Sequence, residues 1–179
     1  MRPPQRATRI LLIGMMGSGK SSVGRALAER TGWPFRDNDA LVERASGRTA
    51  RQLLKDEGEA TLREAESAAL RAGLAVEPPA IIGVAGGVLL DARDRQRIAD
   101  GGFVVWLSAS PEVLAVRAAG AEHRPWLDGD AVGWFRRTMA ERDSRYAEVA
   151  DLRVDTAASK PSEAAGAIVA ALASLPSES

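Results

Sequence analysis

The stretch GMMGSGKS at residues 14–21 constrains this chain more than any other, because it fits the pattern G-x-x-x-x-G-K-[ST] without a mismatch. It follows the apolar run Arg9–Ile13, which is typical of a buried strand, and it leads into the amphipathic segment Gly19–Thr31. A strand, a glycine-rich turn and a helix N-terminus in succession predict a phosphate-binding loop. The alternative, a glycine-rich turn that merely resembles the motif, is disfavoured because both flanks are correct.

Each residue type in this loop suits the binding of nucleotide phosphates. Glycines let successive backbone N–H groups face phosphate oxygens, and the helix N-terminus adds its dipole. Lys20 can reach the terminal phosphates, and the Ser21 hydroxyl can ligate Mg²⁺. The predicted nucleotide-binding residues of the loop are Gly17, Ser18, Gly19, Lys20, Ser21 and Ser22.

Short apolar runs alternate with helical patterns along the chain. Strands are expected at Arg9–Ile13, Pro34–Asp37, Ala80–Val84, Phe103–Leu107 and Leu152–Asp155. Helices are expected at Gly19–Thr31, Ala40–Ala45, Thr49–Asp56, Gly58–Ala72, Ala92–Asp100, Pro111–Ala118, Ala131–Glu148 and Pro161–Leu175. This alternation predicts one α/β domain over residues 1–179, with a parallel sheet covered by helices on both faces. Residues 1–8 and 176–179 are expected to be disordered tails.

Composition excludes several classes of function. The chain has no cysteine, so disulfides, thiolate zinc sites and cysteine nucleophiles are ruled out. The 24 basic and 24 acidic residues give zero formal charge, so no global field favours nucleic acid or an anionic membrane. No apolar run approaches the roughly 18 residues of a membrane span. We therefore expect a cytoplasmic protein with neither nucleic acid nor membrane as a partner.

The second expected strand ends in FRDND, which contributes Asp37 and Asp39. Ligands of open α/β sheets lie beyond the carboxyl ends of the strands, and residues i and i+2 of an extended chain point the same way. One carboxylate could serve the Mg²⁺ shell, while the other accepts a hydrogen bond from a substrate hydroxyl or acts as a base. An equally weighted alternative for Asp39 is the N-cap of the next helix. The third strand does not end in an acidic residue, which favours Asp37 for the metal's outer shell.

Two glycines after the third strand and one arginine in a later loop are further candidates. Gly86 and Gly87 follow the third strand and could let a substrate lie against backbone N–H groups, or could form a plain turn. Residues 120–129 have the composition of a mobile lid, in which Arg124 could neutralise charge on a transferring phosphoryl group. We interpret His123 as a loop residue rather than a ligand or base.

Three of the arginines on expected helices are considered further, for substrate binding or for ion pairing. Arg63 is surrounded by glutamates, and its spacing alone favours a solvated helix arginine. Arg142 and Arg145 lie on the helix that leads to the last strand. A guanidinium there could clamp a carboxylate bidentately, and a surface salt bridge is the alternative.

These motifs together resemble the shikimate kinase family of small P-loop phosphotransferases, from about Arg9 to Leu172. The family's features occur in order as the phosphate loop, FRDNDALVE, GRTARQLLKDEGEATLREAE, AGGV, RPWL and ERDSRYAEVADLRVDT. The resemblance implies a three-layer P-loop kinase fold with a five-stranded parallel sheet in the order 2-3-1-4-5. It also implies a mobile lid at residues 120–129.

The resemblance further implies ATP-dependent, Mg²⁺-assisted phosphorylation of the 3-hydroxyl of shikimate, and we expect a monomer. By matching position, Asp39 would hold the substrate hydroxyls and assist in proton removal. The other implied positions are Arg63, Arg142, Gly86 and Gly87 at the substrate carboxylate, Arg124 in the lid, Arg117 beside adenine, and Ser21 and Asp37 at Mg²⁺. Lys20 and Arg124 would join Asp39 in catalysis.

Four positions depart from the family pattern: Ala85 for a glycine, Leu62 for a phenylalanine, Trp126 for a lid leucine, and Ser159 for an arginine near adenine. The first three would border the acceptor pocket. Two alternatives therefore stay open. One is a P-loop kinase acting on a related cyclitol or on a sugar acid such as gluconate, and the other is a non-catalytic nucleotide-binding domain.

Overall fold

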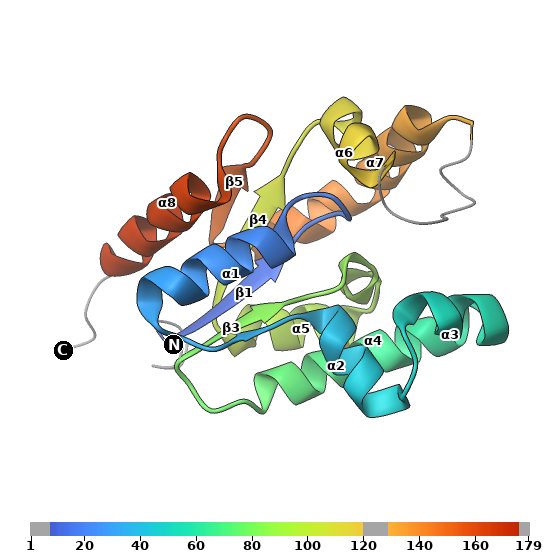
Figure 1. The fold of residues 1–179 in the computed structure, drawn as a ribbon, viewed down its shortest axis with the longest axis horizontal. Coiled ribbons are helices and arrows are strands. Elements are labelled where there is room, and N and C mark those ends of the chain that lie inside the picture. The colour runs from blue at the N-terminus through green and yellow to red at the C-terminus, as the bar shows by residue number, and fades with distance from the viewer. Residues whose placement is uncertain (1–7, 120–128, 176–179) are drawn as a thin grey trace.

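A five-stranded, all-parallel sheet forms the centre of the computed structural model, which describes residues 8–119 and 129–175 (Figure 1). The strands are β1 (Arg9–Ile13), β2 (Phe35–Arg36), β3 (Ala80–Gly83), β4 (Phe103–Ser108) and β5 (Leu152–Asp155). Their order is β2-β3-β1-β4-β5, so the topology implied by the resemblance is confirmed. The expected tails 1–7 and 176–179 lie outside the described residues, whereas Thr8 of the expected N-terminal tail is described.

All eight expected helices are present, each with bounds within two residues of the expected ones. They are α1 (Lys20–Thr31), α2 (Asn38–Ser46), α3 (Ala50–Glu57), α4 (Glu59–Leu74), α5 (Ala92–Gly101), α6 (Pro111–Ala119), α7 (Ala131–Val149) and α8 (Pro161–Ala173). A 3₁₀-helix that the sequence did not predict, η2 (Gly86–Leu90), follows β3. Within the described part of the chain, none of the helices combines the length and apolar character that a membrane crossing requires.

The helices form two layers on opposite faces of the sheet. Figure 1 shows α1 and α8 over one face, and α4, α5 and α7 pack on the other. Successive residues of β1 alternate between the two cores: Ile10 and Leu12 pack toward α1 and α8, while Leu11 and Ile13 pack toward α5 and α7. All of β1 is buried because both faces of the sheet are covered.

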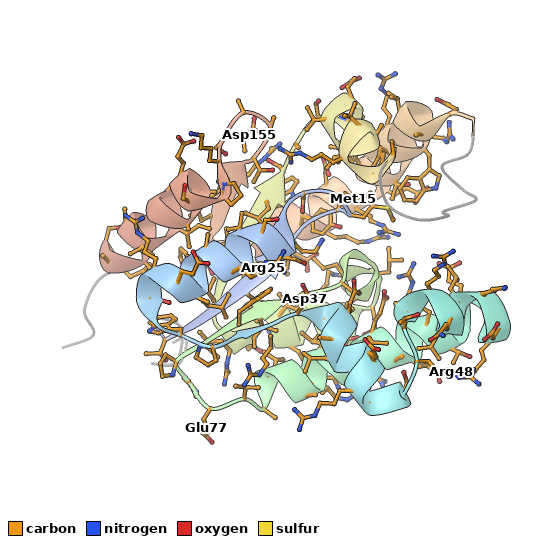
Figure 2. All side chains as sticks on the ribbon, in the orientation of Figure 1. Met15, Arg25, Asp37, Arg48, Glu77 and Asp155 are labelled. Carbon is orange, nitrogen blue, oxygen red and sulfur yellow. The ribbon has the colours of Figure 1, made fainter. Side chains whose placement is uncertain are left out.

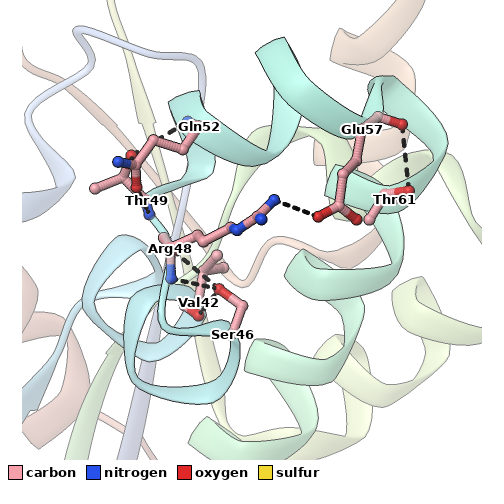
Figure 3. Close-up of polar contacts among 7 residues, drawn as sticks. All are labelled: Val42, Ser46, Arg48, Thr49, Gln52, Glu57 and Thr61. Atoms are coloured by element: carbon pink, nitrogen blue, oxygen red, sulfur yellow. Dashed lines mark hydrogen bonds and ion pairs between the residues drawn. The ribbon is translucent and has the colours of Figure 1, made fainter.

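A third apolar cluster joins α2, α3 and α4 at the β2 edge of the sheet, and its buried members are Val42, Leu53, Leu62 and Ala69. Polar contacts fasten the corner between α2 and α3 (Figure 3). The Arg48 guanidinium bonds Glu57 Oε1 at 2.5 Å, and Ser46 Oγ accepts from Arg48 N at 3.1 Å. A capping box of Thr49 and Gln52 begins α3. This helical unit positions α4, which carries Arg63.

The short edge strand β2 depends on a close approach to α1. The Phe35 ring lies against the backbone of Gly24, so that a Cβ added at Gly24 would come within 2.3 Å of Phe35 Cε2. Glycine is unfavourable inside a helix, and its presence here is explained by this packing. Since Asp37 directly follows β2, the contact also sets where that carboxylate lies.

We predict that Gly24→Ala destabilises the protein by about 1–3 kcal/mol, because the new methyl group overpacks against Phe35 and outweighs the gain in helix propensity. Gly166→Ala on α8 is the matched control, because its Cβ would lie 3.7 Å from Arg30 Cζ, an ordinary contact. We expect that control to be neutral or stabilising by up to about 1 kcal/mol. Urea unfolding of both variants measures this, and equal stabilisation by the two substitutions would contradict it.

Candidate active site

The loop at residues 14–19 lies at the carboxyl end of β1 and turns into α1. Gly19 is the N-cap of α1 and adopts a left-handed conformation with φ of 96°. Gly14 has φ of 146°, and a Cβ there would come within 2.4 Å of the Leu107 carbonyl oxygen on β4. Only glycine fits these two positions, so the loop is held tightly between β1 and β4.

The loop region combines a positive charge with one hydroxyl group that has no hydrogen-bond partner among the described residues. Lys20 Nζ donates to the carbonyl oxygens of Gly14 at 2.8 Å and Met15 at 2.9 Å. The first turn of α1 contains no acidic residue, so its positive dipole end is not neutralised. Ser18 is fully buried, and its hydroxyl has no hydrogen-bond partner among the described residues. Ser22, the third residue of α1, is exposed. The loop is therefore built to receive an anion.

The carboxyl ends of the strands meet at one edge of the sheet, where Figure 2 labels Met15, Asp37 and Asp155. Ser21, in the first turn of α1, donates its hydroxyl hydrogen to the Asp37 carboxylate. Two oxygen donors from α1 and from the end of β2 thus lie in direct contact beside the phosphate loop. Hydroxyl and carboxylate oxygens are ligands that suit Mg²⁺.

Asp37, not Asp39, is the N-cap of α2: its Oδ1 accepts from Asp39 N at 3.2 Å. The N-cap interpretation of Asp39 is therefore wrong. The expectation that strand alternation aligns the two carboxylates is also wrong, because β2 ends at Arg36 and the helix begins at Asn38. Asp39 instead lies exposed in the first turn of α2, where it interacts electrostatically with Glu66 of α4.

Two guanidinium groups from distant helices meet at the turn after β3. A Cβ at Gly87 would collide with the Arg63 guanidinium, at 1.7 Å from Nη1. A Cβ at Gly86 would lie 3.5 Å from Arg142 Nη1. These glycines start η2 rather than forming a plain turn. The lack of a side chain at Gly87 admits Arg63 from α4, and Arg142 from α7 lies beside Gly86. The structure therefore brings together four residues that the sequence placed in three separate motifs.

Arg63 is half-buried and paired rather than solvated, which corrects the interpretation from spacing alone. Its Nη1 bonds Glu66 Oε2 at 2.7 Å, and its Nη2 bonds Glu59 Oε1 at 3.0 Å. Burial lowers the pKa of Arg63, but the two carboxylates outweigh burial and the pKa is raised. The guanidinium is thereby kept charged and aimed at Gly87.

Glu66 is a site residue that sequence reasoning missed. It is only 7% exposed, and it interacts electrostatically with Arg63, Asp39 and Arg142. Burial raises its pKa despite the opposing effect of the arginines. The signal available in the sequence was its position three residues after Arg63 on one helix, but that spacing is equally common on solvated helix faces.

Arg117 of α6 joins the phosphate loop to the segment after β5. Its Nη1 donates to the Gly17 carbonyl oxygen at 3.2 Å, and its Nη2 donates to the Thr156 carbonyl oxygen at 2.5 Å. Thr156 Oγ1 in turn donates to the Ser18 carbonyl oxygen at 2.9 Å. Ser159 Oγ donates to the Asp155 carbonyl oxygen at 3.0 Å.

Two of the four departures from the family pattern contribute to apolar packing. Ala85, with φ of −65°, packs against the core cluster on the α5 and α7 side of the sheet. Leu62 is buried in the cluster between α2, α3 and α4.

Arg145 donates to the Glu141 carbonyl oxygen of its own helix at 3.2 Å. The remaining lid predictions, which involve His123, Arg124 and Trp126, lie outside the described residues.

Comparisons with known proteins agree on one family. The family model for shikimate kinase matches residues 16–173. The shikimate kinase of Symbiobacterium thermophilum is 43% identical over 150 residues, covering 82% of this chain and 86% of its own. The shikimate kinase of Caulobacter vibrioides is 39% identical over 170 residues, covering 94% of this chain and 84% of its own. A solved structure of shikimate kinase from Acinetobacter baumannii in complex with shikimate superposes with a TM-score of 0.89 and 29% identity, covering 97% of each chain.

We predict a pH-dependent contribution of Glu66 to stability. Because its pKa is raised above the ordinary 4.5, the folded protein holds this proton more tightly than the unfolded chain does. The resulting stabilisation is complete below the ordinary pKa and is lost as pH rises through the raised value. Glu66→Gln, which cannot titrate, should therefore show a smaller loss of unfolding free energy than wild type from about pH 4 to about pH 7.

Urea unfolding across this pH range measures the effect. Glu64→Gln is the matched control, because Glu64 lies on the same helix and is exposed. The control should follow the wild-type pH profile. The interpretation of Glu66 fails if Glu66→Gln follows it as well.

Proposed function

This chain belongs to the shikimate kinase family, and we infer that it transfers the terminal phosphoryl group of ATP to the 3-hydroxyl of shikimate, giving shikimate 3-phosphate and ADP. One observation carries the choice of acceptor: Arg63 and Arg142 converge on the Gly86–Gly87 turn. Two planar guanidinium groups at one point suit a single carboxylate. Each also keeps a buried Nε–H without a hydrogen-bond partner among the described residues.

The nucleotide is bound by the phosphate loop. The backbone N–H groups of Gly17, Ser18, Gly19, Lys20, Ser21 and Ser22 face the phosphates, and the Lys20 ammonium exchanges its loop carbonyl partners for phosphate oxygens. Arg117 lies on the adenine side, where it is anchored to Gly17 and Thr156. Arg124, which lies outside the described residues, is proposed to neutralise charge on the phosphoryl group.

Ser21 is the proposed Mg²⁺ ligand, and Asp37 supports the ion through water. Their direct contact fits such a role, since both supply oxygen. No group of three or more histidine, aspartate or glutamate side chains within the described residues could hold a metal alone. Phosphate and water oxygens would complete the coordination, and an ion held there would supply positive charge to the phosphates.

Asp39 acts on the acceptor hydroxyl. Its exposed carboxylate at the start of α2 accepts hydrogen bonds from vicinal hydroxyls while Arg63 and Arg142 hold the carboxylate of the same molecule. As the 3-hydroxyl oxygen bonds to the terminal phosphorus, its proton passes to Asp39 and the bridging oxygen leaves with ADP. Positioning and charge neutralisation supply most of the catalysis. We further propose that the enzyme works as a cytoplasmic monomer without nucleic acid or membrane partners.

We expect ADP release from Mg-ATP to rise strongly when shikimate is added, and Lys20→Ala to lower that rate by about 100-fold or more. A coupled assay of ADP measures the rate, with quinate-type cyclitols and gluconate as competing acceptors. A preference for one of these competing acceptors over shikimate would indicate a related polyol kinase instead. Tight ATP binding with no active acceptor would instead indicate a non-catalytic nucleotide-binding domain.

Asp39→Asn should lower kcat by about 10²–10⁴-fold, because the amide accepts hydrogen bonds but takes up no proton. Arg142→Lys is the comparison variant: it keeps the charge but loses the bidentate fork, so its main effect should be a higher KM for shikimate. Steady-state kinetics with both substrates separates the two effects. Near-normal kcat in Asp39→Asn would remove Asp39 from the proton-transfer step.

A further inference from the structure

Tyr146 is the largest fully buried side chain of α7, one turn after Arg142, and the reaction scheme above gives it no task. Its ring stacks on Trp106 of β4, with the ring centroids 5.5 Å apart and the planes inclined by 27°. The ring is therefore fixed by the core, which sets the position of the hydroxyl group. A phenol ring held in this way keeps its hydroxyl group at a defined position relative to the groups that the hydroxyl contacts.

The hydroxyl lies where the phosphate loop, the Gly86 turn and Arg142 meet. It donates to Met15 Sδ of the phosphate loop at 3.6 Å, and it interacts electrostatically with the Arg142 guanidinium. A Cβ built at Gly86 would lie 2.9 Å from this hydroxyl and 3.2 Å from the Gly14 carbonyl oxygen. A single oxygen atom thus contacts residues from both halves of the site.

The direction of the hydrogen bond to Met15 suits both neighbours of the hydroxyl group. The Tyr146 O–H donates to Met15 Sδ, which leaves the lone pairs of the Tyr146 oxygen for the positive Arg142 guanidinium beside the same glycine. Burial raises the pKa of Tyr146 to about 12, so the hydroxyl keeps its hydrogen at every pH at which the enzyme could work. Arg142 is thereby connected through one neutral group to the loop that holds the phosphates.

We propose that Tyr146 is a positioning residue that ties the Arg142 guanidinium to the phosphate loop, so that nucleotide and acceptor each strengthen the binding of the other. The proposal rests on the proposed role of Arg142 at the acceptor carboxylate. Phosphates that order the loop around Met15 also fix the direction in which the Tyr146 O–H points, and this hydroxyl group orients Arg142 toward Gly86. By linkage, a correctly held acceptor carboxylate favours the same loop arrangement and raises nucleotide affinity by the same factor.

The test is the ratio of the shikimate Kd without and with Mg-ADP, measured by calorimetry for wild type, Tyr146→Phe, Met15→Leu and the double variant. Tyr146→Phe keeps the ring on Trp106 and removes only the hydroxyl. We expect it to bring the ratio close to one and to raise the KM for shikimate by about tenfold, with a much smaller change in kcat. Met15→Leu should reduce the ratio, and the double variant should add little to Tyr146→Phe because both break one chain of contacts.

Val149→Ala is the matched control, because it loosens the buried face of α7 without touching the hydroxyl. It should lower Tm while leaving the Kd ratio at the wild-type value. The proposal would be overturned if Tyr146→Phe kept the Kd ratio of wild type, or if the effects of the two substitutions were additive in the double variant. In either case, shikimate-dependent ADP release by the wild-type protein would still support the proposed function. Absence of that ADP release in wild type would instead count against the function itself.

Discussion

The close approach of the glycine loop to β4 is the constraint on which the rest of the structure depends. Gly14 lies so near the Leu107 carbonyl oxygen that no side chain fits between them. This contact fixes the loop at the carboxyl edge of the sheet and aims the N-terminus of α1 at the same point. Arg117 and Thr156 then anchor the loop from the β5 side. The anion site is therefore a property of three neighbouring strands, not of the loop alone.

The charged side chains on the proposed acceptor side of the site are paired, and this pairing offsets the cost of burying them. Arg63 loses much of its hydration, and its ion pairs with Glu66 and Glu59 compensate for that loss. Glu66 is buried more deeply, and its raised pKa shows that burial dominates there. An isolated buried charge would be costly, whereas a paired and hydrogen-bonded one is retained. Asp39 stays exposed at the start of α2, where a carboxylate can meet an incoming hydroxyl.

Helix α7 connects the two halves of the site. Arg142 lies against the Gly86 turn, while Tyr146 reaches the phosphate loop and stacks on β4. The Gly86–Gly87 turn in turn begins η2, whose last carbonyl groups accept hydrogen bonds from Arg95 of α5. Arg95 also pairs with Glu148 of α7 at 3.2 Å. The residues proposed to bind the acceptor are thus held in place by α5 as well as by the strands.

The sequence by itself determined the strands, the α-helices and the phosphate loop, because all three depend on local patterns: apolar runs for strands, 3.6-residue periodicity for helices, and a complete loop motif. The strand order and the site residues came from an ordered set of motifs that resembles one family. Only the tertiary structure decided which carboxylate caps α2, that Arg63 is buried and paired, and that Glu66 and Tyr146 belong to the site. These facts depend on contacts between residues far apart in the chain or on where β2 stops, and no local spacing encodes them.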